Sequence, residues 1–202
     1  MTLIASFRTA SHAFLLVLAG LFLTGCGINN IPTYEENAKA KWSQVLNTYK
    51  RRADLIPNLV ETVKGFAAQE KDVLTSVVEA RAKATQTTLT PDMLTNADAV
   101  KAFAENQAAL SGALSRLLVT VERYPELKSS ENFLTLQSQL EGTENRIAVA
   151  RRDYIEAVRQ YNTELKTFPG RIWKGVMYSD NEPMVTFEIT AEDTVNPKVS
   201  FD

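Results

Sequence analysis

A helical repeat of apolar residues runs through most of the chain and limits its fold more than any other feature. From Tyr34 to Gln86, and again from Pro91 to Phe168, apolar side chains recur at steps of three and four residues. This is the spacing of one face of an α-helix. Only 8 Gly and 7 Pro occur among the 202 residues, and most lie outside the middle of the chain. The pattern therefore predicts an all-α fold built from long helices.

Capping and turn residues divide the pattern into three long helices. Thr33 and Glu36 have the spacing of a capping box, which places the first helix at about residues 34–86. Pro91 suits the first position of a second helix, expected over residues 91–124. Ser129 or Ser130 caps the third, which extends to about residue 168. Short connections make consecutive helices antiparallel neighbours, so we expect an up-and-down bundle.

Pro57 lies near the middle of the first predicted helix. Proline removes one helical hydrogen bond and its ring crowds the carbonyl four residues earlier, so we expect a kink or a break here. A break converts the three helices into a four-helix bundle. Residues 170–202 contain more turn residues and are expected to form an extended C-terminal tail, either lying on the bundle or mobile.

The N-terminal residues indicate where the protein is located. An apolar run from Ala13 to Leu23 follows a segment with one basic residue, and it is shorter than the roughly 20 residues that span a bilayer. The run ends in Leu-Thr-Gly-Cys at Cys26, which resembles a bacterial lipobox. We expect a signal peptide at 1–25, a lipidated N-terminus and linker at 26–33, a bundle at 34–169 and the tail at 170–202. An uncleaved transmembrane anchor is the alternative.

Composition excludes several functional classes. The 22 basic and 24 acidic residues give a net charge of −2, whereas a nucleic-acid binder normally carries a basic excess. The chain has one Cys and one His, His12, and cleavage before Cys26 removes that His, while acylation blocks the thiol. Cys–His metal sites and His-dependent catalysis therefore lose a required group. We expect no metal, no cofactor and no enzymatic activity.

Charged residues near Pro57 form one candidate site. Arg52, Asp54, Pro57 and Asn58 are expected either to form a docking surface for a partner protein or simply to cap the interrupted turn. In the second case Asn58 or Arg52 hydrogen-bonds the carbonyl that Pro57 leaves free at position 53.

Polar residues within the apolar stripes form a second candidate site. Glu70, Gln107, Glu144 and Arg151 occupy positions where the helical period calls for apolar side chains. They are expected either to form a hydrogen-bonded polar layer inside the bundle or to reach solvent along the edges of the stripes.

The order of certain residues resembles the LemA family. The resemblance extends from Cys26 to about Pro169 and is carried by RRADLIPNLVETVKGF at 51–66, Glu70, Ala80-Arg81, Glu122, 124–128, Phe133, 144–147, Ala150-Arg151, Tyr161-Asn162 and Phe168-Pro169. It implies an all-helical bundle on the extracytoplasmic face of a bacterial membrane, anchored by its N-terminus, in a family with no established catalytic function. Gln69 departs from the His that many members carry before Glu70.

These observations lead to three functional hypotheses. The first is a non-enzymatic lipoprotein on the extracytoplasmic (periplasmic) face of the cell envelope, held in the membrane by its N-terminal lipid and acting as a scaffold or interaction module for other envelope proteins. The second is a bundle that binds a small ligand or lipid in space opened at Pro57 and lined by Ile56, Phe66 and Tyr154. The third is an enzyme that uses Glu70 and Glu144.

Overall fold

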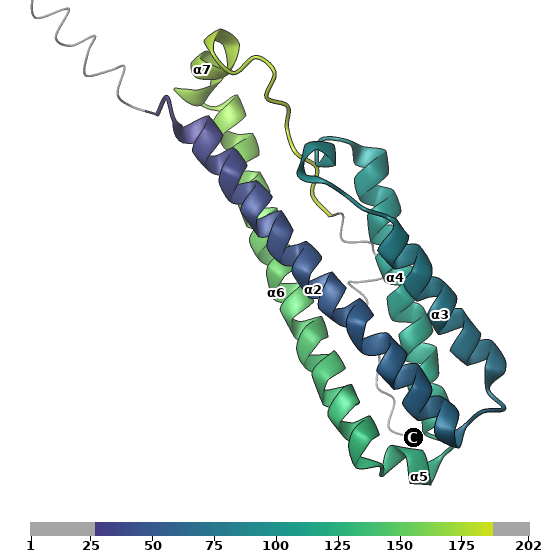
Figure 1. Cartoon of the computed structure of the whole chain (residues 1–202). Coiled ribbons are helices and arrows are strands. Elements are labelled where there is room, and N and C mark those ends of the chain that lie inside the picture. The colour runs from purple at the N-terminus through teal and green to yellow at the C-terminus, as the bar shows by residue number, and fades with distance from the viewer. Residues whose placement is uncertain (1–26, 188–202) are drawn as a thin grey trace, which may run out of the picture.

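The computed structural model describes residues 27–187, and within that range every regular element is helical. The all-α prediction is confirmed. Figure 1 shows two pairs of long helices, α2 with α6 and α3 with α4, lying roughly side by side. Cys26, the predicted signal peptide and residues 188–202 lie outside the described residues. None of the described helices is long and apolar enough to cross a membrane.

Helix α2 spans Asn30–Phe66, so it begins four residues before the predicted start. Thr33 and Glu36 are in its first turns and do not form its cap. Ile31 is fully buried in the core, and packing of this side chain explains why the helix extends upstream of the capping-box residues. The sequence-based boundary at Tyr34 was wrong because a buried contact outweighed a local signal.

The first predicted helix is interrupted at a different place from Pro57. Helix α2 passes through Pro57 without a break, so the break predicted there is wrong. The chain turns instead at residues 67–70, where the Glu70 amide hydrogen-bonds the Ala67 carbonyl, and α3 spans Lys71–Gln86. Ala67 is fully buried, and its packing holds this turn against the neighbouring helices.

The remaining boundaries agree more closely with the sequence. Residues Pro91–Met93 form only a 3₁₀ turn, η1, and α4 spans Ala97–Val121 with the Asn96 side chain as its cap. A short helix, α5 (Pro125–Lys128), leads to α6 (Glu131–Lys166), which Ser130 caps as predicted. Helix α7 (Gly170–Val176) follows.

The core consists of two clusters of buried side chains at opposite ends of the molecule. The upper cluster joins α2, α6, the start of α4, the loop before it and residues 184 and 187. It contains Trp42, Tyr49, Leu94, Phe103, Tyr154, Val158, Tyr161, Met184 and Phe187. The lower cluster joins α2, α3, α4 and α6, and contains Ile56, Leu59, Val63, Val77, Leu110, Leu114, Leu117, Leu127 and Phe133. Apolar burial of this extent is the main stabilising contribution to such a fold.

The C-terminal segment folds back onto the bundle. Gly170 begins α7, and a Cβ atom at this position would lie 2.2 Å from the Glu164 carbonyl oxygen, so only glycine fits the close approach. After α7 the chain descends between the two helix pairs (Figure 1) as far as residue 187. Residues 170–176 of the predicted extended tail form helix α7, so that part of the prediction is wrong. Residues 182–187 contact the bundle.

Candidate functional site

Arg52 is the centre of a buried polar cluster between the two cores. Its side chain is 2% exposed. One guanidinium nitrogen, Nη2, donates to the Gln107 side-chain oxygen at 2.7 Å, and the other, Nη1, donates to Ser111 Oγ at 2.8 Å and to Glu144 Oε1 at 3.0 Å. The guanidinium carbon also lies 5.1 Å from the centre of the Tyr49 ring. This geometry suits the planar fork of arginine, with several donors in fixed directions.

The Arg52 cluster links all four long helices. Gln107 of α4 receives the hydrogen bond from Arg52 of α2 and donates its own side-chain amide to the Ala84 carbonyl of α3 at 3.2 Å. Glu144 supplies the contact from α6 and remains 41% exposed. The carboxylate therefore stays hydrated while the guanidinium is enclosed, and the cluster acts as a polar layer that fixes how the helices are aligned.

The predicted polar layer is only partly reproduced. Gln107 and Glu144 belong to one polar cluster, but both bind Arg52, which was expected in a docking surface. Glu70 lies instead at the lower end, where it accepts hydrogen bonds from Tyr124 Oη at 2.7 Å and Arg123 Nη2 at 3.1 Å. The hydrogen bond to Glu70 is the main cause of a raised pKa at Tyr124.

Within residues 27–187, Arg151 forms no hydrogen bond or ion pair with the members of the Arg52 cluster. Its guanidinium carbon is 5.0 Å from the centre of the Phe187 ring, a cation–π distance. Its partner comes from the C-terminal segment, which periodicity along a helix does not reveal.

The residues around Pro57 do not form one surface. Arg52 is buried, whereas Asp54, Pro57 and Asn58 are exposed, so the predicted docking surface of these four residues is wrong with respect to Arg52. Asp54 pairs with Lys50 at 2.7 Å. The carbonyl of residue 53 accepts a hydrogen bond from Arg81 Nε of α3 at 2.8 Å. The predicted capping by Asn58 or Arg52 was wrong, because a neighbouring helix supplies the donor.

Two further sequence hypotheses lose their geometric basis. Ile56 belongs to the lower core, Tyr154 to the upper core, and Phe66 is 45% exposed, so these three residues do not line a common space. Glu70 and Glu144 belong to the separate clusters described above and do not form a carboxylate pair. Among residues 27–187, no three His, Cys, Asp or Glu side chains are grouped as metal ligands would be.

The C-terminal segment is bound through its main chain. Asn162 of α6 contacts both sides of Met184: its Nδ2 donates to the Met184 carbonyl at 2.8 Å, and its Oδ1 accepts from the Met184 amide at 2.9 Å. The amide of Val185 donates to the Leu94 carbonyl at 2.8 Å. The hydroxyl groups of Tyr154 and Tyr161 donate to the carbonyls of residues 185 and 182. We call the surface formed by Leu94, Tyr154, Tyr161 and Asn162, with Trp42 beneath them, the tail site.

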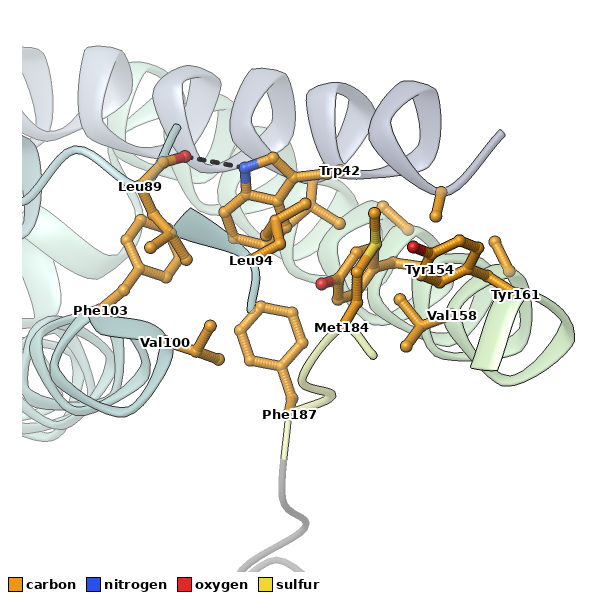
Figure 2. Close-up of a cluster of buried hydrophobic side chains, with 14 of the residues drawn as sticks. Trp42, Leu89, Leu94, Val100, Phe103, Tyr154, Val158, Tyr161, Met184 and Phe187 are labelled. Atoms are coloured by element: carbon orange, nitrogen blue, oxygen red, sulfur yellow. Dashed lines mark hydrogen bonds between the residues drawn. The ribbon is translucent and has the colours of Figure 1, made fainter. Parts of the chain in front are cut away.

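Two apolar side chains of the segment enter the core at the tail site. Met184 and Phe187 are 6% and 4% exposed. In Figure 2 both point toward Trp42 and Tyr154, whose rings lie 5.7 Å from the Phe187 ring. Trp42 itself is held by a hydrogen bond from its indole nitrogen to the Leu89 carbonyl at 2.8 Å. Burial raises the pKa of the Tyr154 and Tyr161 hydroxyl groups, so both remain protonated donors at neutral pH.

Sequence reasoning missed the tail site. Tyr161 and Asn162 contribute to the sequence analysis only through the family resemblance, and residues 170–202 only as an expected extended tail, although Val185, Thr186 and Phe187 alternate between apolar and polar. The signal that could have found the site is the combination of these two features. An extended segment with apolar alternation needs main-chain partners, and an Asn beside a buried Tyr on a helix can supply them.

The described residues thus define an all-α protein that carries a buried Arg52 cluster and binds its own C-terminal segment. The chain belongs to the LemA family, whose model matches residues 41–201. The resemblance noted from the sequence is confirmed.

Curated relatives include three magnetosome proteins. Magnetosome proteins MamQ 1 and MamQ 2 of Paramagnetospirillum magneticum are each 26% identical over 157 residues, which cover 70% of this chain and 58% of theirs. Magnetosome protein MamQ of Magnetospirillum gryphiswaldense is 25% identical with the same coverage. The chain thus spans somewhat more than half the length of these relatives.

Proposed function

We propose that this LemA-family protein is a membrane-anchored, non-enzymatic interaction module that binds an extended peptide segment of another envelope protein at the tail site. The anchor is a lipid on Cys26, and the bundle lies on the extracytoplasmic face. The observation that carries the proposal is the binding of residues 182–187 through their main chain. These residues occupy the tail site as a peptide ligand would, and a partner's segment replaces them.

The contacts define the kind of segment that fits. The hydrogen bonds involve only main-chain groups of residues 182, 184 and 185, and nearly every residue offers such groups. Selectivity comes from the two buried side chains, Met184 and Phe187, which lie three positions apart. A suitable ligand is therefore an extended segment with large apolar residues at that spacing, recognised by main-chain bonds and side-chain pockets together.

Binding of the chain's own segment is weak enough for exchange. Five hydrogen bonds contribute about 1 kcal/mol each, and burial of two large apolar side chains contributes about 1.5–3 kcal/mol each. Ordering the backbone of these six residues costs about 1–2 kcal/mol for each residue. The gain of roughly 8–11 kcal/mol and the cost of roughly 6–12 kcal/mol nearly cancel, so the segment is expected to leave and return without unfolding of the bundle.

Hydrogen exchange of the full chain tests whether the segment opens separately. The amides of Met184 and Val185 are expected to exchange at least tenfold faster than those of Val45 and Val158, which lie within α2 and α6. Equal protection of all four amides would mean that the segment is an integral part of the core, and the proposal would be wrong.

A direct binding experiment tests the site itself. A chain ending at Asp180 is mixed with a fluorescent peptide of residues 181–190, and binding is followed by anisotropy. We expect the shortened chain to bind it more tightly than the full chain does, because the full chain carries a competing segment.

Two variants control for specificity. Asn162→Ala is expected to weaken binding about tenfold, since two main-chain bonds are lost, whereas Asn145→Ala at an exposed position of the same helix leaves binding unchanged. A peptide with Met184→Ala and Phe187→Ala should not bind. Absence of binding to a shortened chain that remains helical by circular dichroism contradicts the proposed function.

A further inference from the structure

Exposed apolar side chains are concentrated where α6 passes into α7. Phe168, Ile172, Val176 and Met177 are 79%, 51%, 74% and 56% exposed. Among the described residues, Phe168 and Val176 have the highest exposed fractions of any large apolar side chain. Trp173 of the same helix packs against the upper core, so α7 is held with the other residues facing outward. Apolar side chains gathered in this way are typical of a contact surface.

Basic side chains lie beside these apolar residues. A surface hollow of about 580 Å³ is lined by Lys166, Arg171 and Lys174, together with Leu165, Gly175 and Ser179. None of the three cations forms an ion pair with a carboxylate of residues 27–187. The hollow therefore presents uncompensated positive charge, which suits the phosphate groups of anionic lipids.

The start of the described chain lies directly against this region. Gly27 has a φ of 88°, and a Cβ atom added there would lie 2.9 Å from Pro169 Cγ. The neighbouring Asn30 donates a hydrogen bond to Glu164 of α6 at 3.2 Å. In the proposed anchored protein the lipid is on Cys26, the residue that directly precedes Gly27, and one residue spans at most about 3.6 Å. A membrane that holds this lipid is thus within reach of α7.

We propose that the α7 end of the molecule is a membrane-contact face for an anionic phospholipid bilayer. Phe168, Ile172, Val176 and Met177 enter the interfacial region of the lipid, and the three basic residues bind the phosphate headgroups. The combination of exposed apolar residues and adjacent cations is that of an interfacial membrane segment. This inference rests on the proposed membrane anchor but is independent of peptide binding at the tail site.

The test compares two equally exposed positions at opposite ends of the molecule. Val176→Cys and Val119→Cys are made in the full chain. Val176 and Val119 are 74% and 72% exposed. Each protein is labelled with an environment-sensitive fluorophore and reconstituted into vesicles of phosphatidylcholine with phosphatidylglycerol. The unsubstituted chain, whose one cysteine is Cys26, is labelled in parallel as a blank. Flotation of the vesicles records anchoring independently of the label.

The label at position 176 is expected to show the blue shift of an apolar environment and quenching by lipids brominated on their acyl chains, whereas the label at 119 shows neither. Charge reversal by Lys166→Glu, Arg171→Glu and Lys174→Glu should abolish the shift, since each basic residue near an anionic surface strengthens binding about fivefold. Circular dichroism checks that the variant remains helical.

Each possible outcome decides a separate part of the proposal. If the protein floats but the label at position 176 shows no blue shift, the membrane-contact face is wrong and the proposed anchor stands. A protein that does not float overturns both. A blue shift at 176 that survives charge reversal, or that is equal in vesicles of phosphatidylcholine alone, shows that headgroup binding by the three cations is wrong.

Discussion

Removal of the Arg52 side chain is the perturbation that most sharply separates a structural polar layer from incidental surface charge. The guanidinium is enclosed and donates to Gln107, Ser111 and Glu144. Substitution by alanine removes these donors and leaves a space where the aliphatic part of the side chain had packed. The Gln107 side-chain oxygen then loses its hydrogen-bond donor. Because Gln107 is only 6% exposed, water does not replace that donor.

The magnitude follows from the exposure of each partner. Arg52→Ala leaves the buried Gln107 oxygen unsatisfied, which costs about 1–3 kcal/mol, and the lost packing of the aliphatic stem adds to this cost. Glu144, 41% exposed, recovers hydration in that variant. Glu144→Gln keeps an oxygen that can accept from Arg52 but leaves the enclosed guanidinium without a carboxylate, so it is expected to cost more than the roughly 1 kcal/mol of an exposed ion pair. Arg52→Met retains the aliphatic volume and is expected to cost less than Arg52→Ala.

Urea unfolding of a chain that begins at Gly27, followed by far-UV circular dichroism and by tryptophan fluorescence, measures these differences. Arg52→Ala is expected to destabilise the protein more than Arg52→Met, and Glu144→Gln more than an exposed ion pair would. A loss below about 1 kcal/mol for Arg52→Ala or for Glu144→Gln would refute the assignment of Arg52 as an enclosed charge that the cluster compensates.

Three other expectations can be checked independently. Cys26→Ser should leave an unprocessed precursor without acyl mass, and a normally processed, lipid-bearing product in mass spectrometry would contradict lipidation at this residue. Pro57→Ala should raise the free energy of unfolding by about 1–3 kcal/mol, because the new amide can share the Ala53 carbonyl with Arg81; a decrease in urea titrations argues against it. Burial raises the pKa of Tyr154 and Tyr161 from 10.0, so above pH 10 the unfolded chain releases protons that the folded chain retains. The free energy of unfolding should therefore fall by about 1.4 kcal/mol per pH unit for each Tyr. Tyr154→Phe should reduce this slope.

The helices were largely predictable from sequence, because their signals are local. Apolar periodicity gave the helical class, and Ser130 gave the start of α6. The position of the first turn was not predictable. Pro57 is tolerated within α2 because Arg81, 28 residues from Ala53, satisfies the free Ala53 carbonyl. The actual turn at Ala67 is held by burial and by contacts of Glu70 with residues 123 and 124.

The polar residues were recognisable as unusual, but their partners were not. Gln107 and Glu144 stood out because they interrupt apolar stripes. Arg52 did not, since it stands beside Arg51 and close to Pro57, which suggested a docking surface or a cap for the interrupted turn. Which member of the pair turns inward depends on the packing angle of α2 against α4 and α6. Likewise, Asn162 became interpretable only when residues 182–187 were found against it.

The arrangement places the proposed anchor, the membrane-contact face and the tail site at one end of the molecule. Residue 27 touches Pro169, α7 follows directly, and residues 177–180 connect α7 to the segment in the tail site. Asn181 also donates to Glu35 of α2 at 2.6 Å, which ties the beginning of the segment to the first helix. Because so few residues separate α7 from the tail site, seating α7 in lipid restricts where residues 181–187 can lie. The opposite end carries the Glu70 contacts, which join the turn between α2 and α3 to the turn between α4 and α5. A partner segment is therefore expected to bind close to the bilayer, while the lower half of the bundle supplies the rigidity that keeps the tail site formed.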